Sequence, residues 1–305
     1  MGSSSFDSVM QAALRPNSPP APMRSLQSVP LTLRATIDYA LEANGSGFRL
    51  KLAKATGIAC GLSSAAVDEL AEGIEYFHHA SLIFDDLPCM DDATERRGRR
   101  CVHRVAGESQ AILAGLALVN RAYTMCWKVA AQYPEHSGSA ARLVERCIGE
   151  LGILDGQDRD LSFDPSLGAK EVKAIAAGKT GALLQLTLLL PAILSGSSFS
   201  ELLKLSRVAR CWGIAYQGLD DFNDMLLAGS ETGKTPFRDL TLNRPNLVVA
   251  MGPVEAHLAV QDYLLRATSQ IEQLVEIDEK WSVLSNFHSV MLGKESALSA
   301  ALEVA

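Results

Sequence analysis

Residues 67–92 read VDELAEGIEYFHHASLIFDDLPCMDD. In this stretch apolar residues recur at every third or fourth position, the spacing of a helix with one buried face: Val67, Leu70, Ile74 and Phe77. The same spacing continues through the chain from Leu31 onward, whereas the alternating β-branched runs that are typical of strands are missing. We therefore predict that residues 31–305 form an all-α fold, a single-domain bundle of roughly ten helices.

The composition limits the classes of function. The chain has 305 residues, of which 48% are hydrophobic, so it can bury a sizeable core. Its 35 acidic and 28 basic residues give a net charge of −7. That charge disfavours a protein whose main task is to bind nucleic acid or anionic lipid, because such partners need a basic surface. The longest apolar run, Gly181 to Leu194, is shorter than the roughly 18–20 residues of a membrane span.

The first 30 residues differ from the rest, since they are rich in Ser and Pro. We expect a disordered or loosely attached tail over residues 1–30. A plastid-type transit peptide is the less favoured interpretation, because the segment is short. The six cysteines form no Cys-x-x-Cys pair, which favours reduced thiols and a cytoplasmic location.

Two clusters of aspartates stand far apart in the chain: Asp85, Asp86, Asp91 and Asp92, and then Asp220, Asp221 and Asp224. A single acidic cluster is commonly a solvated helix end, but apolar residues flank both clusters and place them at the edge of a core. Asp220 and Asp224 are four residues apart, so they share one helix face. Because close carboxylates repel one another, a hard cation such as Mg²⁺ or Mn²⁺ stabilises them, and Mg²⁺ usually binds substrate phosphates as well. The clusters therefore predict one diphosphate held between metal ions.

Basic residues accompany both clusters. Arg96, Arg97, Arg99 and Arg100 follow the first cluster, Lys234 follows the second, and Lys179 lies between them in the sequence. Arginine and lysine both bind phosphate oxygens. An arginine run alone is more often a solvated surface, but its position directly after an aspartate cluster favours a site. Gly233-Lys234-Thr235 is not a P-loop, because the earlier glycine of that motif and any strands are missing.

Together these motifs resemble those of the trans-isoprenyl diphosphate synthase (polyprenyl synthetase) family, from about Leu31 to the C-terminus. Asp85-Asp86-x4-Asp91 with Arg96-Arg97-Gly98 looks like the first aspartate-rich motif, and Gln217-x-x-Asp220-Asp221-x-x-Asp224 looks like the second. Shorter motifs follow in the expected order: Gly107-Glu108, Gly156-Gln157-x-x-Asp160, Lys179-Thr180, Gly233-Lys234 and Arg238-Asp239. The likeness is greatest to bacterial geranylgeranyl diphosphate synthases, through His79-Ala80-Ser81-Leu82, Leu87-Pro88-Cys89 and Arg244-Pro245-Asn246.

The resemblance implies the isoprenoid synthase fold, with a central prenyl pocket, and a Mg²⁺-dependent prenyltransferase. Such an enzyme condenses isopentenyl diphosphate with dimethylallyl, geranyl or farnesyl diphosphate, here to give geranylgeranyl diphosphate. The implied metal ligands are Asp85, Asp86, Asp91, Asp220, Asp221 and Asp224. The implied catalytic residues are Asp85, Asp86, Lys179, Asp220 and Lys234. The implied substrate-binding residues are Arg49, Lys51, His78, Arg96, Arg97, Thr180 and Gln217.

The acceptor side of the implied site departs from the family pattern. The family has Gly-Gly-Lys-x-x-Arg before the first aspartate helix, and its Lys and Arg bind isopentenyl diphosphate. Aligned with Ser46 to Lys51, this pattern has Phe48 in place of the Lys and Lys51 in place of the Arg. A terpene synthase derived from this family, which ionises an allylic diphosphate without an acceptor, is therefore an alternative. A regulatory, non-catalytic subunit is less favoured, because both aspartate motifs are intact.

Product length and assembly also follow from the resemblance. In this family a bulky residue about one helical turn before the first aspartate motif stops chain growth. The matching residues, Ala80 and Ser81, are small, which implies a product longer than C10. Tyr76 and Phe77, one turn deeper, are expected to close the pocket near C15–C20. Related enzymes are usually homodimers, so we expect a homodimer here.

Overall fold

The structure, a computed structural model, describes residues 31–42, 45–226 and 244–304. The chain divides into two compact units, Met1–Thr32 and Leu33–Ala305, and the elements below belong to the second. The tail expected over residues 1–30 lies outside the described residues.

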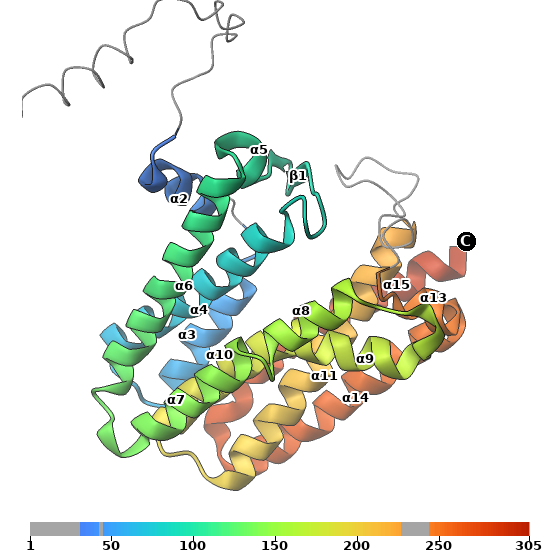
Figure 1. The fold of residues 1–305 in the computed structure, drawn as a ribbon. Helices are drawn as coiled ribbons and strands as arrows, with labels where there is room; N and C mark the ends of the chain where they lie inside the picture. The colour runs from blue at the N-terminus through green and yellow to red at the C-terminus, as the bar shows by residue number, and fades with distance from the viewer. Residues whose placement is uncertain (1–30, 43–44, 227–243, 305) are drawn as a thin grey trace, which may run out of the picture. The chain divides into compact units, whose positions relative to one another are not determined.

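The second unit is built from helices, which confirms the predicted fold class (Figure 1). In the described part the α-helices are α2 (Leu33–Leu41), α3 (Phe48–Ala59), α4 (Ser64–Asp85), α5 (Val102–Ala106), α6 (Glu108–Ala130), α7 (Pro134–Ile148), α8 (Ile153–Leu161), α9 (Gly168–Lys179), α10 (Gly181–Leu194), α11 (Phe199–Leu226), α13 (Leu247–Met251), α14 (Pro253–Ile277) and α15 (Val283–Val304). Two 3-10 helices, η1 (Pro165–Leu167) and η3 (Glu279–Ser282), precede α9 and α15. These helices outnumber the roughly ten predicted, because short ones such as α5 and α13 carry too few residues to show a period.

Helix α4 carries the stretch that predicted the fold. It begins after Ser63, whose side chain accepts a hydrogen bond from the backbone N–H of Ala66 at 3.2 Å and so caps the first turn. Its buried residues include Val67 and Phe77, at the positions where the helical period placed them. This face packs on α3 and α6, so the helix is held firmly and its last residue, Asp85, has a fixed place.

Helix α10 lies inside the bundle. Twelve of its fourteen residues are buried, and it packs against α3, α4, α7, α9 and α11. A helix that is apolar on every side is expected in such a position. Among the described residues no single helix has the length and apolarity to cross a membrane, although Pro165–Lys179 and Gly181–Leu194, bent by 43°, meet that test as a pair on length and composition.

A short hairpin follows the first aspartate cluster. Strand β1 (Glu95–Arg96) pairs antiparallel with β2 (Arg99–Arg100), and Arg97 and Gly98 form the turn with φ values of 55° and 73°. Positive φ at both turn residues matches the twist of two-residue hairpins, although Arg is strained in that conformation. Two-residue strands are too short to show alternation, so the sequence analysis missed them. The hairpin fixes the backbone positions of Arg96 and Arg97, from which their side chains extend.

Close contacts between glycines bring α10 and α11 together. A Cβ atom on Gly213 would lie 2.6 Å from the Cα of Gly181, so only glycine fits there. One turn after Gly213, Gln217 reaches Thr180 at the start of α10. The backbone approach at the glycines therefore places two polar side chains at the edge of the core.

Candidate active site

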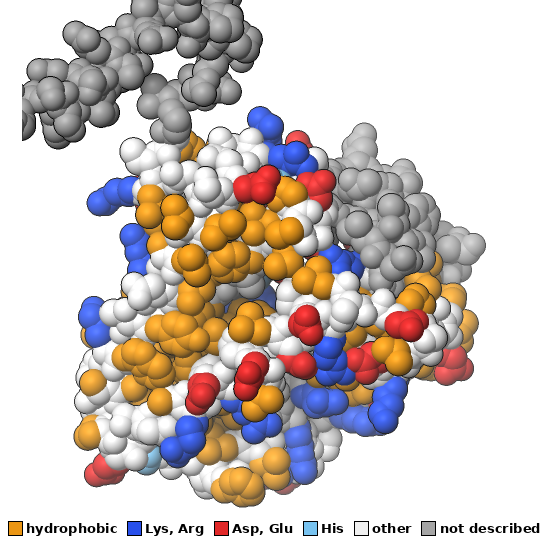
Figure 2. Space-filling view, in the orientation of Figure 1, with side chains coloured by type: hydrophobic (Ala, Val, Ile, Leu, Met, Phe, Trp, Pro, Cys, Tyr) orange, Lys and Arg blue, Asp and Glu red, His pale blue; other side chains and the backbone are white. Residues whose placement is uncertain are grey.

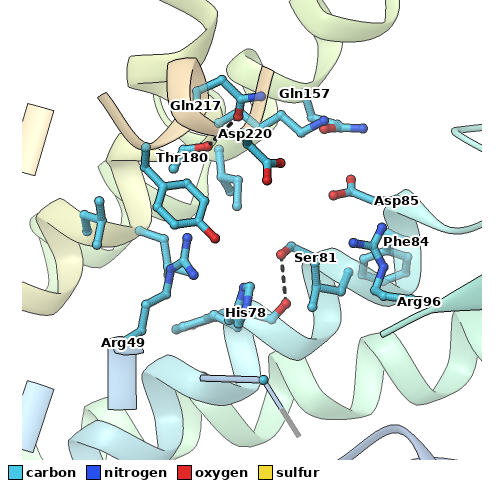
Figure 3. Close-up of a pocket in the computed structure, with 18 of the residues that line it drawn as sticks. Arg49, His78, Ser81, Phe84, Asp85, Arg96, Gln157, Thr180, Gln217 and Asp220 are labelled. Atoms are coloured by element: carbon cyan, nitrogen blue, oxygen red, sulfur yellow. Dashed lines mark hydrogen bonds between the residues drawn. The ribbon is translucent and has the colours of Figure 1, made fainter. Parts of the chain in front are cut away.

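One large cavity opens between α3, α4, α8, α9, α10, α11 and α15 (Figure 3). Its volume is about 690 Å³, which lies in the usual range for small-molecule sites. One part of its wall is polar and carries Asp85, Asp91, Lys179, Asp220 and Asp224. Another part is apolar and carries Phe77, Ala80, Phe84, Val119, Ile148, Leu183 and Leu184. The cavity can thus hold a molecule with a charged head and a hydrocarbon tail.

The two aspartate clusters meet in this cavity, although 135 residues separate Asp85 from Asp220. Asp85 is the last residue of α4, and Asp220 and Asp224 lie in the last two turns of α11. Figure 3 shows the carboxyl groups of Asp85 and Asp220 directed toward the same space. Because helix carboxyl ends carry partial negative charge, both helices add to the attraction for a cation there.

Burial raises the pKa of Asp85 to about 6, with Asp91 adding to the rise and Lys179 opposing it. Lys179 is itself largely shielded, and its Nζ lies 3.0 Å from an oxygen of Asp160. Burial lowers the pKa of Lys179, but Asp85, Asp160 and Asp91 outweigh that effect and raise it overall. Lys179 therefore stays charged among the carboxylates and is placed to neutralise an incoming anion.

Arg244 joins the two sides of the site and was given no role by the sequence analysis. Its guanidinium donates to Asp91 Oδ1 at 2.8 Å and to the carbonyl oxygen of Met90 at 2.9 Å. It also donates to the carbonyl oxygen of Asp160 at 3.2 Å. Asp160 was noted only as part of a short motif, and its carboxylate was not expected to hold Lys179. The sequence could have indicated a role for Arg244 through its position: it is a basic residue that follows the second aspartate motif and stands directly before Pro245.

Two of the expected metal ligands have other partners. Asp86 is buried, and Arg96 donates to its Oδ1 from Nε at 2.8 Å and from Nη2 at 2.7 Å. Asp221 is completely buried, and its two oxygens accept hydrogen bonds from Gln217 at 3.0 Å and from the backbone N–H of Leu247 at 2.7 Å. Neither aspartate lines the cavity. Asp86 and Asp221 therefore support the site through these bonds, and their expected role in metal binding stays a prediction.

The expected diphosphate-side residues Arg96, Thr180 and Gln217 do line the cavity. Thr180 donates a hydrogen bond to Gln217 Oε1 at 3.3 Å, and Gln217 donates in turn to Asp221. These two hydrogen bonds fix the Gln217 amide, so the amide dipole is oriented before any ligand binds. Lys234, the remaining expected catalytic residue, lies outside the described residues.

The acceptor side differs from the expectation at residue 51. Lys51 donates to the carbonyl oxygen of Ser46 at 3.0 Å, is exposed and does not line the cavity. Arg49 lines the cavity instead, and Figure 3 shows its side chain reaching into it. The pattern Gly-Lys-x-x-Arg therefore fits two residues earlier, with Ser46 in place of the Lys and Arg49 as the Arg. The physical reason is the helical turn, because residues 49 and 51 point to different sides of α3.

His78 and Arg97 lie on the same side as Arg49. Both line the cavity, and the Arg97 guanidinium lies against Gly45, where a Cβ would come within 2.4 Å of Arg97 Nη1. Burial is the main reason that the pKa of His78 is lowered to about 2, and the nearby charges of Arg49 and Arg97 lower it further. His78 is therefore neutral in the folded protein and can donate one hydrogen bond and accept another.

This neutral histidine should make stability fall in mild acid. In the unfolded chain His78 has an ordinary pKa near 6.5, so below that pH only the unfolded state binds the proton. The free energy of unfolding of the wild type should thus fall by about 2 kcal/mol more than that of His78→Gln between about pH 7 and pH 5. Urea unfolding of both proteins across this range measures the difference. Parallel pH profiles would contradict the assignment of a buried neutral His78.

The structure distinguishes Phe77 from Tyr76, which were both expected to close the pocket. Ala80 and Ser81 line the wall, as expected, and so does Phe77, whose ring packs edge-on against Tyr123 with 5.0 Å between centroids. Tyr76 does not line the cavity, and its hydroxyl donates to Glu72. Phe77 is therefore the residue placed to limit the tail of a bound molecule.

The carboxylates of the polar wall fit a magnesium ion that arrives with a phosphate. In the described part of the chain no three His, Cys, Asp or Glu side chains converge closely enough to hold a metal by themselves. Mg²⁺ commonly uses only one or two carboxylates and fills its remaining positions with water and substrate phosphates. Asp85 and Asp91 on one side, and Asp220 and Asp224 on the other, supply hard oxygen ligands of that kind.

Comparison with known proteins gives consistent results. The chain matches the polyprenyl synthetase family over residues 30–279. It is 35% identical to geranylgeranyl pyrophosphate synthase 9, chloroplastic, of Arabidopsis thaliana, over 74% of this chain and 65% of that protein. It is 32% identical to geranylgeranyl pyrophosphate synthase, chloroplastic, of Capsicum annuum, over 80% of this chain and 67% of that protein. The chain thus spans about two thirds of the length of these relatives.

Solved structures show the same fold. A geranyltransferase from Helicobacter pylori, complexed with magnesium and isoprenyl diphosphate, matches with a TM-score of 0.74 at 21% identity, over 88% of this chain and 91% of that one. An isoprenoid synthase family member from Thermotoga neapolitana matches with a TM-score of 0.69 at 25% identity, over 86% of this chain and 92% of that one. These matches confirm the predicted isoprenoid synthase fold.

Proposed function

Because the chain belongs to the polyprenyl synthetase family, we propose that it is a trans-prenyltransferase that condenses isopentenyl diphosphate with an allylic diphosphate. The proposed product is geranylgeranyl diphosphate. The curated relatives that bear that name support it, and so does a cavity whose wall stays small at Ala80 and closes at Phe77.

The observation that carries the proposal is the pairing of Asp85 and Asp220 across one cavity that has an apolar wall. The polar part suits a diphosphate, and the apolar part suits a prenyl tail. We assign Mg²⁺ binding to Asp85, Asp91, Asp220 and Asp224, and Mn²⁺ is an alternative with the same ligands. Bound Mg²⁺ would supply Lewis acidity that stabilises the leaving diphosphate.

The chain's own residues prepare the same step. Condensation begins when the C1–O bond of the allylic diphosphate breaks and the bonding electrons leave with the diphosphate. Lys179 holds positive charge on the cavity wall where that anion would develop, and the fixed Gln217 amide lines the same cavity, where its dipole would stabilise the cationic carbon. The apolar side chains Phe84 and Leu183 exclude water, which would otherwise capture the cation.

The second substrate then completes the reaction. The double bond of isopentenyl diphosphate forms a carbon–carbon bond to C1 of the allylic cation, and a proton leaves C2 of the added unit for the released diphosphate. Arg49 and Arg97 are placed to bind the diphosphate of isopentenyl diphosphate, with neutral His78 beside them. The presence of Arg49 in the cavity favours chain elongation over the terpene synthase alternative.

The proposal is tested with the purified chain, Mg²⁺ and farnesyl diphosphate, with and without isopentenyl diphosphate. We expect geranylgeranyl diphosphate only when both substrates are present, as measured by mass spectrometry of the diphosphate products. A hydrocarbon or alcohol formed from the allylic diphosphate alone would favour the terpene synthase. No turnover by the purified chain would favour the regulatory subunit.

We also propose that the protein forms a homodimer through α6. An apolar stripe with residues three and four apart runs along this helix, and three of its members are at least 41% exposed: Ile112, Leu116 and Trp127. Figure 2 shows hydrophobic side chains gathered on this face of the molecule. A second copy that presents the same helix would cover the stripe with a matching one, as a two-fold interface requires.

The cytoplasmic location stays a prediction.

Replacing Leu116 by Glu should separate the dimer. The substitution puts a charge at the centre of the stripe, where it would be desolvated against its symmetry mate. We expect the dissociation constant to rise by about 10²-fold or more, measured by light scattering and analytical ultracentrifugation. Leu258→Glu on α14, a site of similar exposure at 52%, is the control. A wild type that is monomeric, or a dimer unaffected by Leu116→Glu, would contradict the assigned face.

A further inference from the structure

The acceptor side of the cavity lacks a cation that the family pattern provides. Ser46 lines the cavity at the position of the family lysine, and its hydroxyl carries no charge. A diphosphate bound between Ser46 and Arg49 therefore loses one of its counter-charges. If the chain uses isopentenyl diphosphate, as proposed above, another residue has to replace that lysine.

Lys294, on the C-terminal helix α15, reaches the same cavity. Its Nζ lies 4.7 Å from the ring centroid of Tyr216, which also lines the cavity, so a cation–π contact holds the ammonium at the mouth. Within residues 31–42, 45–226 and 244–304 Lys294 has no carboxylate within ion-pair distance. Its neighbour Glu295 is occupied by His257, Gln261 and Ser299.

An aromatic junction explains why α15 lies close to the acceptor side. The ring of Phe48 packs edge-on against Phe287 of α15 with 5.6 Å between centroids, and against Trp212 of α11 at 6.3 Å. Phe287 and Lys294 are seven residues apart, so they share one face of α15. The same Phe48 that stands directly before Arg49 thus anchors the helix that carries Lys294.

Arg49 is ready to share an anion with Lys294. Its guanidinium makes no hydrogen bond or ion pair with any residue that the structure describes, and its Nε is shielded from solvent without a partner. Glu75 lines the same cavity, and its carboxylate interacts electrostatically with Arg49 and Arg97. Arg49, Arg97 and Lys294 together bring three cations to the wall of this cavity, which suits a diphosphate.

We propose that Lys294 replaces the missing lysine and, with Arg49, binds the diphosphate of isopentenyl diphosphate. The acceptor site of this chain is then built from α3 and the C-terminal helix α15, rather than from the segment before α3 alone. Tyr216 is a positioning residue, because its ring holds the Lys294 ammonium in place.

The test is steady-state kinetics of Lys294→Met, with the two substrates varied separately. We expect the KM for isopentenyl diphosphate to rise about tenfold, because one charged contact to phosphate is lost, while the KM for farnesyl diphosphate stays within about twofold. Lys294→Arg should keep most of the affinity. Lys170→Met, which removes an exposed lysine of α9 outside the cavity, is the matched control and should change neither KM.

A rescue variant separates charge from folding. Adding Ser46→Lys to Lys294→Met restores a cation at the family position and should recover most of the affinity for isopentenyl diphosphate. An unchanged KM for isopentenyl diphosphate in Lys294→Met would overturn the inference, and so would an equal rise for both substrates. If the wild type does not elongate, the proposed function fails, and calorimetry of isopentenyl diphosphate in EDTA decides the role of Lys294 separately. Equal binding by wild type and Lys294→Met there would overturn it, and weaker binding by the variant would support it.

Discussion

Asp220→Asn should lower kcat about 10³-fold at saturating substrates, and Asp85→Asn should do the same. Each replacement keeps the shape of the side chain but removes a charge that we assign to Mg²⁺ binding at the cavity. Loss of this stabilisation in the transition state is worth about 4 kcal/mol, and each 1.4 kcal/mol corresponds to a factor of ten in rate. The thermal midpoint should not fall, because burial and neighbouring carboxylates already oppose the charge of Asp85.

The neighbouring aspartate gives the sharpest contrast. Asp221→Ala leaves the backbone N–H of Leu247 and the Gln217 amide without their acceptor in a fully buried place, which should lower stability by about 1–3 kcal/mol. Asp158→Asn, on the exposed side of α8, should leave both rate and stability unchanged. Turnover and urea unfolding measured on all four variants test the distinction. If Asp220→Asn kept more than a tenth of the wild-type kcat, the assignment of Asp220 would be wrong.

Phe77→Ala should lengthen the product by at least one C5 unit. Phe77 lies eight residues before Asp85, about 12 Å deeper along α4, and its ring closes the cavity against Tyr123. Removing the ring extends the space for the prenyl tail. Mass spectrometry of products from farnesyl diphosphate and excess isopentenyl diphosphate measures the shift. Because Phe→Ala in a core costs about 3–5 kcal/mol, Phe77→Leu serves as a milder second variant.

Tyr76→Ala is the matched control for product length. Tyr76 precedes Phe77 directly, but its side chain points away from the cavity and bonds Glu72. Its removal should leave the product at its original length. Ser81→Phe, which adds a ring to the wall one turn before Asp85, should shorten the product. An unchanged product in Phe77→Ala and Phe77→Leu, or a longer one in Tyr76→Ala, would contradict the role given to Phe77.

Much of the site could be predicted from the sequence because its residue types are typical of metal and phosphate binding. Repeated aspartates at helical spacing, such as Asp220 and Asp224, have few structural uses at the edge of a core, so their pattern indicates a cation. Lys179, Thr180 and Gln217 were identified by short motifs, and all three line the cavity. The helical period of residues 67–77 predicted both α4 and its buried face.

Other features depended on which way a side chain points, and a motif does not contain that information. Lys51 and Arg49 are two residues apart, and only the turn of α3 shows that Arg49 enters the cavity while Lys51 faces Ser46. Asp86 and Asp221 look like ligands in the sequence, yet Arg96 and the backbone of Leu247 bind them.

The sequence by itself therefore determined the all-α class, the two aspartate motifs and the family likeness, because these depend on residue type and local spacing. Only the tertiary structure decided that Arg244 bonds Asp91, that Asp160 holds Lys179 and that Lys294 lies over the ring of Tyr216. These pairs are 19 to 153 residues apart along the chain or lie on different helices. Such contacts arise from how helices pack, and helix packing depends on the shapes of whole buried faces rather than on any short motif.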